Sequence, residues 1–338
     1  MSDIKDLRDR GQYRRTVAED FPEELRIGDV EFRKMRGLKY GENPGMPSAL
    51  YAEVGSTGPS VANYEILQEN KDKKLGYINI LDLNAGLKAV RRMKHLYPND
   101  VITSISKHVG PCCGLARAGS SLQAYNDAWD INDLAAFGGV LAFSDEVDGK
   151  TADLMTTRFF ECVIAPAYSK EALEVLARKP DVRVVRVPSL DTPLTDHDFQ
   201  YTKLEGGLLV QKRFHSRIDS KDKFKTVSAR QPTEEELVGA GQYSRIDSTR
   251  LAIYYSNTRC RNGMSRGRTM TSEAFFPSRD SIDLAGISGV KSVVFPLGSI
   301  EDPNVIQAGN EYNMSLLVPM PDPDNPKETE RAFVHLVH

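Results

Sequence analysis

The central part of the chain alternates short apolar runs with segments whose apolar residues recur at helical spacing. Leu75–Ile80 predicts a short strand, and Asp82 then offers an N-cap for a helix. The apolar stripe of that helix consists of Leu83, Leu87, Val90 and Met93, and the helix is predicted to stop at Pro98. The pattern therefore opens with a strand followed by an amphipathic helix.

The same alternation continues to residue 187. Strands are predicted at 101–106, 138–143, 162–165 and 182–187, and helices at about 115–129, 150–158 and 169–178. Repeated strand–helix alternation is typical of a parallel or mixed sheet with helices on both faces. We therefore expect an α/β fold.

The chain is predicted to divide at about residue 190. Residues 1–20 are charged with little apolar periodicity and are expected to form an N-terminal arm; 21–190 then form a first subdomain and 191–338 a second. The polar stretch 188–204 marks the boundary. In the second part, Thr233–Glu236 fits a capping box. A strand, a helix and a strand are predicted there at 292–295, 303–312 and 316–318.

Composition excludes several classes of protein. Of 338 residues, 40% are hydrophobic and 27% are charged, as in ordinary globular proteins. No apolar run approaches the ~20 residues that span a bilayer, so no membrane partner is expected. A net charge of −3 argues against a nucleic-acid partner. The first residues show no secretory signal and the four cysteines show no paired framework, so a soluble, cytoplasmic protein is expected.

The strongest candidate for chemistry is Lys107-His108, which follows the apolar run Val101–Ile105 and precedes a Gly/Pro/Cys turn and the predicted helix. A lone histidine is more often structural than catalytic. Its position favours function, because ligands of α/β sheets sit at the carboxyl ends of strands. An imidazole can accept a proton from an attacking amine, and an ammonium can stabilise a developing oxyanion. The pair suits acyl or formyl transfer.

Three glycine-bearing loops are weaker candidates. Lys39–Pro47 fits a plain surface loop as well as a site. Phe137-Gly138-Gly139 allows a backbone to approach a ligand closely, and Gly239–Arg245 resembles a loop that binds an anion at a helix start. Cys112-Cys113 lacks the spacing of a zinc site, so no metal is expected and both cysteines are interpreted as buried small groups.

Seven motifs occur in the order seen in one enzyme family. They are Lys39–Pro44, Lys107-His108 with Pro111-Cys112, Ala136–Gly139, Phe160–Pro166, Gly239–Arg245, Ala274–Pro277 and Arg331–His335. Over about residues 32–338 the chain resembles the transformylase part of the family of aminoimidazole carboxamide ribonucleotide (AICAR) formyltransferase/IMP cyclohydrolase. The resemblance implies an α/β fold of two cytidine-deaminase-like subdomains, with mixed sheets flanked by helices and without the zinc.

The roles of individual residues are implied by motif position. The implied reaction passes a formyl group from formyltetrahydrofolate, as co-substrate, to the 5-amino group of AICAR in purine (IMP) biosynthesis, and it requires no metal. His108 is implied as the base and Lys107 as its assistant at the formyl oxygen or the folate nitrogen. Nucleotide contacts are implied for Lys39, Tyr40, Gly41, Phe137, Gly138, Glu161, Ser244, Arg245 and Arg331, and folate contacts for Phe276 and Phe333. The family builds its site across a homodimer, so a homodimer with interfacial active sites is expected.

Departures from the family pattern keep alternatives open. Lys39 stands where the family has Arg, which keeps the charge but loses the bidentate fork. The turn after His108 has a substitution and one extra residue. Between Glu236 and Gly239 the family has a further helix, a strand and an asparagine used near the formyl group, so either residues are omitted from the chain there or it is a shorter variant.

The family's cyclohydrolase domain does not precede the first motif, so ring closure to IMP is not expected. Two further hypotheses stand beside AICAR formyltransferase. One is a weakened or non-catalytic nucleotide-binding homologue, and the other is a formyltransferase with a different formyl donor.

Overall fold

The computed structural model describes residues 20–43, 45–56, 58–187, 190, 199–212, 224–233, 269–272 and 275–320. The chain forms two compact units, Met1–Thr195 and Asp196–His338. In the described part of the chain, no helix combines the length and the apolar character that crossing a membrane requires.

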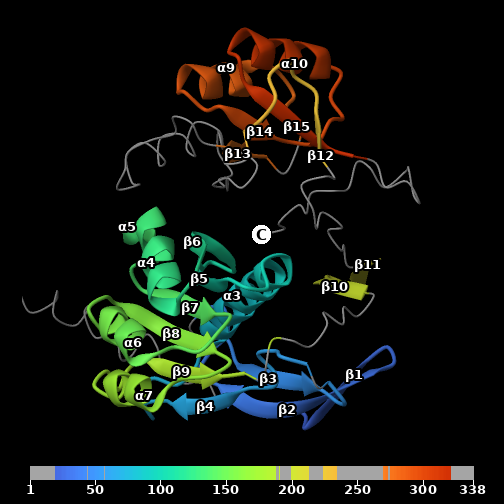
Figure 1. The fold of residues 1–338 in the computed structure, drawn as a ribbon. Coiled ribbons are helices and arrows are strands. Elements are labelled where there is room, and N and C mark those ends of the chain that lie inside the picture. Colours follow the sequence, from blue (N-terminus) through green and yellow to red (C-terminus); the bar gives the residue numbers. More distant parts are fainter. Residues whose placement is uncertain are drawn as a thin grey trace, which may run out of the picture. The chain divides into compact units, whose positions relative to one another are not determined.

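The first unit is built on a six-stranded mixed sheet with the order β4-β9-β8-β7-β5-β6 (Figure 1). Its strands are β4 (Glu65–Gln68), β5 (Val101–Lys107), β6 (Gly110–Ala118), β7 (Gly139–Phe143), β8 (Phe160–Ala165) and β9 (Arg183–Arg186). Strands β7, β8 and β9 run parallel, whereas β5 is antiparallel to β7. The carboxyl end of β5 therefore lies at the amino ends of the three parallel strands.

Helices cover both faces of this sheet. The covering elements are α3 (Tyr77–Leu96), α4 (Ser121–Ile131), α5 (Asp133–Ala136), α6 (Gly149–Thr156) and α7 (Lys170–Leu176). Successive strand residues point to opposite faces. Leu141 and Val163 accordingly join the core beside α4, α6 and α7, whereas Val140 and Cys162 join the core beside α3. The predicted α/β arrangement, with helices on both faces of a mixed sheet, is confirmed.

The predicted strand at Leu75–Ile80 is wrong, because α3 already begins at Tyr77. Ile80 extends the buried stripe of Leu83 and Leu87 by one turn. The side-chain oxygen Oδ1 of Asn79 accepts a hydrogen bond from the Gly76 backbone N–H at 3.2 Å and supports the helix start. Asp82 is therefore a buried residue inside the helix, and its predicted role as N-cap is wrong.

The Lys107-His108 turn leads into strand β6 and not directly into a helix, so the helix predicted at about 115–129 begins later than expected, as α4. The turn is the tip of an antiparallel hairpin of β5 and β6, paired from Val101 with Ala118 to Ile105 with Gly114. Helix α4 starts only at Ser121, where the Ser120 hydroxyl accepts from the Gln123 N–H. Beside the tip the register shifts, because Lys107 lies opposite both Gly110 and Pro111.

A three-stranded antiparallel sheet precedes the large sheet in the chain. It consists of β1 (Glu24–Ile27), β2 (Val30–Leu38) and β3 (Ser48–Glu53), in the order β1-β2-β3. Glu69 connects it to α3, because its carboxylate binds Arg36 of β2 at 3.2 Å and accepts from the Leu75 backbone N–H at 2.7 Å. Glu69 therefore joins β2 to the segment that leads into α3.

The second unit has a smaller mixed sheet. Its order is β12-β15-β14-β13, made of β12 (Phe224–Thr226), β13 (Thr269–Thr271), β14 (Ser292–Val294) and β15 (Ser315–Pro319). Helices α9 (Asp280–Ile287) and α10 (Asp302–Glu311) pack on it around a core that includes Ile282, Val293, Val305 and Leu316 (Figure 1). A hairpin of β10 (Phe199–Leu204) and β11 (Gly207–Lys212) precedes this sheet in the chain. The strand, helix and strand predicted between 292 and 318 are confirmed as β14, α10 and β15.

Candidate functional site

The hairpin tip that carries the Lys-His pair has an unusual backbone. His108 and Val109 have φ angles of 53° and 67°, and Lys107 pairs with Gly110 across them. Positive φ at both central residues is the signature of a type I′ turn, which Asn and Gly normally occupy. For a β-branched residue such as Val109 this conformation is rare and costs on the order of 1–3 kcal/mol. Other contacts must hold the tip in this form.

One such contact comes from α3. The Val109 backbone N–H donates a hydrogen bond to Asp82 Oδ1 at 2.7 Å. Asp82 is 4% exposed, whereas Val109 is 53% exposed. Burial raises the pKa of the Asp82 carboxyl, while the Val109 N–H and the positive charges of His108 and Lys107 oppose that rise. A buried carboxylate thus supports an exposed, strained turn.

A second contact holds Lys107 against the turn before β7. Its Nζ donates to the Phe137 carbonyl at 2.8 Å. In that turn Gly138 has φ 74°, and its N–H donates to the Phe159 carbonyl at 2.8 Å. Gly139 is required by packing, because a Cβ there would lie 2.8 Å from the Ile105 side chain. The Lys107 ammonium therefore sits directly beside the Phe137-Gly138 turn.

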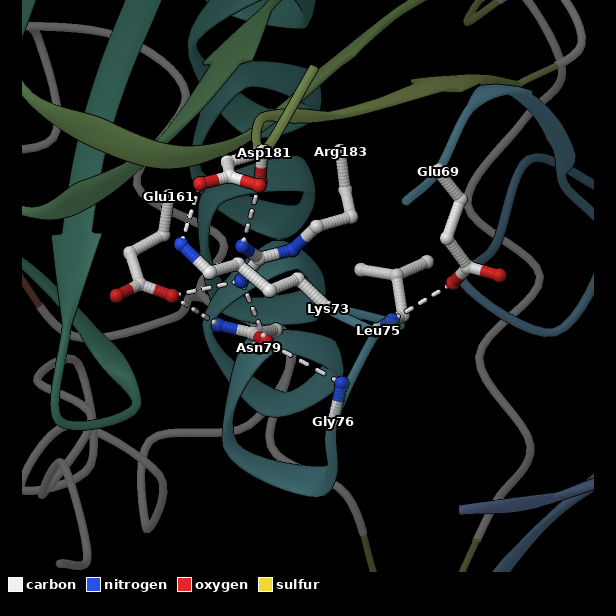
Figure 2. A network of polar contacts seen from close by, with 8 residues as sticks. All are labelled: Glu69, Lys73, Leu75, Gly76, Asn79, Glu161, Asp181 and Arg183. Carbon is white, nitrogen blue, oxygen red and sulfur yellow. Dashed lines mark hydrogen bonds and ion pairs between the residues drawn. The ribbon is translucent and has the colours of Figure 1, made fainter. Parts of the chain in front are cut away.

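Glu161, at the start of β8, belongs to a polar network shown in Figure 2. Arg183 Nη2 donates to Glu161 Oε2 at 2.6 Å and to Asn79 Oδ1 at 2.9 Å, and Nη1 donates to the Asp181 carbonyl at 3.0 Å. The Arg183 side chain is 7% exposed and that of Glu161 is 40% exposed. The network fixes one oxygen of Glu161, and in Figure 2 the other oxygen points away from the partners drawn.

These contacts place several predicted residues at one edge of the six-stranded sheet. Lys107 ends β5 and His108 follows it, Phe137 and Gly138 precede β7, and Glu161 is the second residue of β8. The edge is formed by the carboxyl end of β5 but by the amino ends of β7, β8 and β9. The expectation that site residues lie at the carboxyl ends of strands therefore holds for β5, which carries the Lys-His pair, but not for β7 and β8.

Other predicted residues lie elsewhere or outside the described ranges. Lys39, Tyr40 and Gly41 follow β2 of the smaller sheet, and no hydrogen bond between described residues joins them to the edge. Phe276 is 5% exposed and packs against Phe295 in the core of the second unit, with ring centroids 5.2 Å apart. The predicted residues and segments outside the described ranges are Ser244, Arg245, Arg331, Phe333, the 1–20 arm apart from Asp20, the Gly239–Arg245 loop and most of the capping box.

Asp82, Asn79 and Arg183 contribute to this edge, although the sequence did not single them out as site residues. The only available signal was a carboxylate at position 82 within an otherwise apolar helix stripe. Of the two adjacent cysteines, Cys112 and Cys113, Cys113 is buried as expected, at 1% exposure. Within the ranges that the structure describes, no group of three or more His, Cys, Asp or Glu side chains could hold a metal ion.

The edge combines an ammonium, an exposed imidazole and a half-exposed carboxylate on rigid elements. Such a set can bind a polar ligand, move a proton and stabilise negative charge on oxygen. Fold and edge together define a mixed α/β protein with a site suited to acid–base chemistry.

Comparison with known proteins identifies the family. Residues 7–238 match the family described as AICARFT/IMPCHase bienzyme, and the chain belongs to that family. The chain is 35% identical over 314 residues to the bifunctional purine biosynthesis protein PurH of Neisseria meningitidis serogroup C, and 36% identical over 315 residues to PurH of Neisseria gonorrhoeae. Each match covers 84% of this chain and 57% of the relative, so the chain spans little more than half the length of these relatives.

Proposed function

We propose that the protein is an AICAR formyltransferase, which transfers a formyl group from formyltetrahydrofolate to the 5-amino group of AICAR in purine biosynthesis. The observation that carries this proposal is the clustering of Lys107, His108, the Phe137-Gly138 turn and Glu161 at one sheet edge. These residues are spread over 55 positions of the chain and lie in three different motifs of the family. Membership of the family supports the same assignment.

The proposed reaction is an acyl transfer between two nitrogens. The AICAR amine attacks the formyl carbon and forms the new N–C bond, while the carbonyl electron pair moves onto oxygen. His108 accepts the amine proton, and the Lys107 ammonium stabilises the oxyanion. The bond between the formyl carbon and the folate nitrogen then breaks, and the proton passes to that nitrogen. The products are the formylated nucleotide and tetrahydrofolate.

The amine is a weak nucleophile, because its lone pair delocalises into the ring and the carboxamide. General acid–base catalysis contributes roughly 10²–10⁴-fold in such steps, and fixed geometry contributes further. The open oxygen of Glu161 is suited to accept an N–H of the nucleotide, since its other oxygen is held by Arg183. We assign Glu161 to recognition of the nucleotide base.

The remaining assignments rest on the motifs. Lys39, Tyr40, Gly41, Ser244, Arg245 and Arg331 are proposed to hold the nucleotide, with Phe276 and Phe333 lining the folate pocket. We also propose two cytidine-deaminase-like subdomains at about 21–190 and 191–338, and a cytoplasmic homodimer with sites at its interface. No metal takes part in the proposed reaction.

The test is formyl transfer from formyltetrahydrofolate to AICAR by protein whose intact mass matches the sequence. Wild-type protein is expected to turn over. His108→Ala is expected to abolish turnover while nucleotide affinity stays within about tenfold, because a general base acts mainly in the transition state. The matched control is His95→Ala, which removes an exposed histidine in the last turn of α3 and is expected to change neither quantity. Full turnover by His108→Ala would refute the mechanism.

Two other outcomes separate the alternatives. Nucleotide binding without turnover by the wild-type protein would indicate a non-catalytic homologue. Turnover with formate and ATP or with formyl phosphate, but not with formyltetrahydrofolate, would indicate a different formyl donor. A mass above that of the sequence would indicate additional residues, and peptide mapping would test whether they lie between Glu236 and Gly239.

A further inference from the structure

The side chain of Asp82, in α3, reaches the backbone of the hairpin tip: its Oδ1 accepts a hydrogen bond from the Val109 N–H at 2.7 Å. Val109 directly follows His108, and both residues have positive φ. We infer that Asp82 is a positioning residue, which holds the tip so that the His108 imidazole and the Lys107 ammonium face the same reacting group. The inference rests on the proposed formyl transfer.

The position of Asp82 is itself fixed by packing. Leu83 and Leu87, on the same helix, are 2% and 3% exposed. The helix lies so close to the sheet that a Cβ on Gly86 would be 3.0 Å from the Ala142 side chain and 3.1 Å from Ser106 Oγ. A helix in such close contact cannot follow movements of the turn. Asp82 therefore acts as a fixed support and not as a mobile partner of the tip.

The two sides of the tip are held from different elements. Lys107 is bound to the Phe137 carbonyl before β7, and Val109 is bound to Asp82 on α3. His108 lies between these two anchors with an exposed side chain. If the Asp82 bond is lost, Val109 can leave its unfavourable conformation and His108 turns with it, because the two share a peptide bond. Lys107 keeps its own anchor, so the pair loses its mutual geometry.

Asp82 holds the tip through one acceptor oxygen at a fixed position. An asparagine at position 82 has nearly the same shape and keeps one acceptor oxygen, whereas an alanine has none. Asp82→Asn is therefore expected to retain most of the positioning, and Asp82→Ala to lose it. A misplacement of about 1 Å at a reacting group lowers rates by as much as ~10²-fold.

The experiment compares Asp82→Ala, Asp82→Asn and a control, Asp148→Ala, in the full chain. Asp148 also accepts one backbone N–H, that of Thr151, at the same 2.7 Å, but it lies beyond the other end of β7. Three quantities are measured: kcat for formyl transfer, the Kd of AICAR by calorimetry, and hydrogen exchange of the Val109 amide by NMR. Circular dichroism identifies any variant that fails to fold.

Asp82→Ala is expected to lower kcat by 10- to 100-fold with the Kd of AICAR within threefold, and to speed Val109 amide exchange at least tenfold. Asp82→Asn is expected to recover most of both losses, and Asp148→Ala to leave kcat and Val109 exchange unchanged. The inference is overturned if Asp82→Ala leaves Val109 exchange and kcat unchanged, if kcat and nucleotide affinity fall in parallel, or if Asp82→Asn is as impaired as Asp82→Ala.

Val109 exchange also separates this inference from the proposed function. If the wild-type protein transfers no formyl group, the proposed function fails, and the exchange rates of the two Asp82 variants still decide whether Asp82 holds the tip. If Asp82→Ala does not fold, Asp82→Asn alone decides whether the hydrogen bond holds the tip. Preserved protection of the Val109 amide in Asp82→Asn supports the hydrogen bond, and lost protection contradicts it.

Discussion

The buried pair of Arg183 and Glu161 predicts that removal of its two partners has unequal effects on stability. Substitution of Glu161 by Leu leaves the Arg183 side chain at 7% exposure, where its hydrogen-bond partners include the neutral Asn79 Oδ1 and the Asp181 backbone carbonyl. Truncation of Arg183 to Met leaves a carboxylate that is already 40% exposed and that water can reach. Removal of Glu161 is therefore expected to lower the free energy of unfolding more than removal of Arg183.

The expected magnitudes follow from this difference in exposure. A buried ion pair that loses one partner is destabilised by about 3–5 kcal/mol when the remaining charge stays buried. Because Arg183 keeps two neutral acceptors, we expect the low end, about 3 kcal/mol, for Glu161→Leu. For Arg183→Met we expect about 1–2 kcal/mol, the typical net value of charge-assisted hydrogen bonds.

The assay is urea unfolding followed by the fluorescence of Trp129. It is the only tryptophan of the chain, it is 7% exposed, and it lies in the core of the first unit. Its signal therefore reports the unit that contains the pair. The control is Arg178→Met, which breaks a surface pair with Asp153 at 3.8 Å and is expected to change stability by less than about 0.5 kcal/mol. The reasoning is refuted if Arg183→Met proves more destabilising than Glu161→Leu.

Three further predictions use the same unit. Gly114→Ala is expected to destabilise it by about 3 kcal/mol, because the new Cβ would lie 1.9 Å from the Ala128 carbonyl oxygen, whereas Gly119→Ala meets no atom within 4 Å and should be neutral in the same urea titration. Cys162, whose thiol pKa is raised to about 12 by burial, and Cys113 are expected to resist maleimide until urea unfolds the protein; peptide mass mapping that finds either labelled in native protein contradicts their burial. Burial raises the pKa of Asp82 above 3.8, so the folded state binds the Asp82 proton more tightly than the unfolded state does. Wild type should therefore gain stability relative to Asp82→Asn as pH falls from 7 towards 4. A stability difference that stays constant with pH counts against the raised pKa.

The fold class could be predicted from local patterns, but some elements could not. Strand β7 and residues 162–165 of β8 are continuous apolar runs, which strongly indicate buried strands. The start of α3 was missed because Ile78-Asn79-Ile80 alternates as a strand does, and only the tertiary structure shows Ile80 on the helix stripe. Strand β6 was not predicted because its glycines and proline are typical of a loop. It is a strand because it pairs with β5, which its own sequence does not show.

The candidate site was predictable where one motif carries the chemistry. Lys107-His108 stands out because a strand delivers both residues to a turn. Arg183 does not stand out, because its contact with Glu161 arises only when β8 and β9 pair in parallel with Cys162 opposite Arg183. Asp82 was misassigned because a helix N-cap and a buried support for a turn 27 positions away involve the same residue type.

The register shift beside the hairpin tip bears on how this motif tolerates changes in length. The extra residue relative to the family pattern is the second cysteine of Cys112-Cys113 in β6, where the register against β5 shifts between Ile105 and Lys107, as at a β-bulge, in which one strand accommodates an extra residue. The bulge lies in β6, an edge strand, where a proline without an N–H disturbs no further ladder. Strand β5, the inner neighbour of β6, keeps a regular register with β7, in which Ser106 lies opposite Val140. The extra residue between Pro111 and Gly114 is thus absorbed in the strand at the border of the sheet, and the spacing between the Lys-His pair and the Pro-Cys pair stays that of the family pattern.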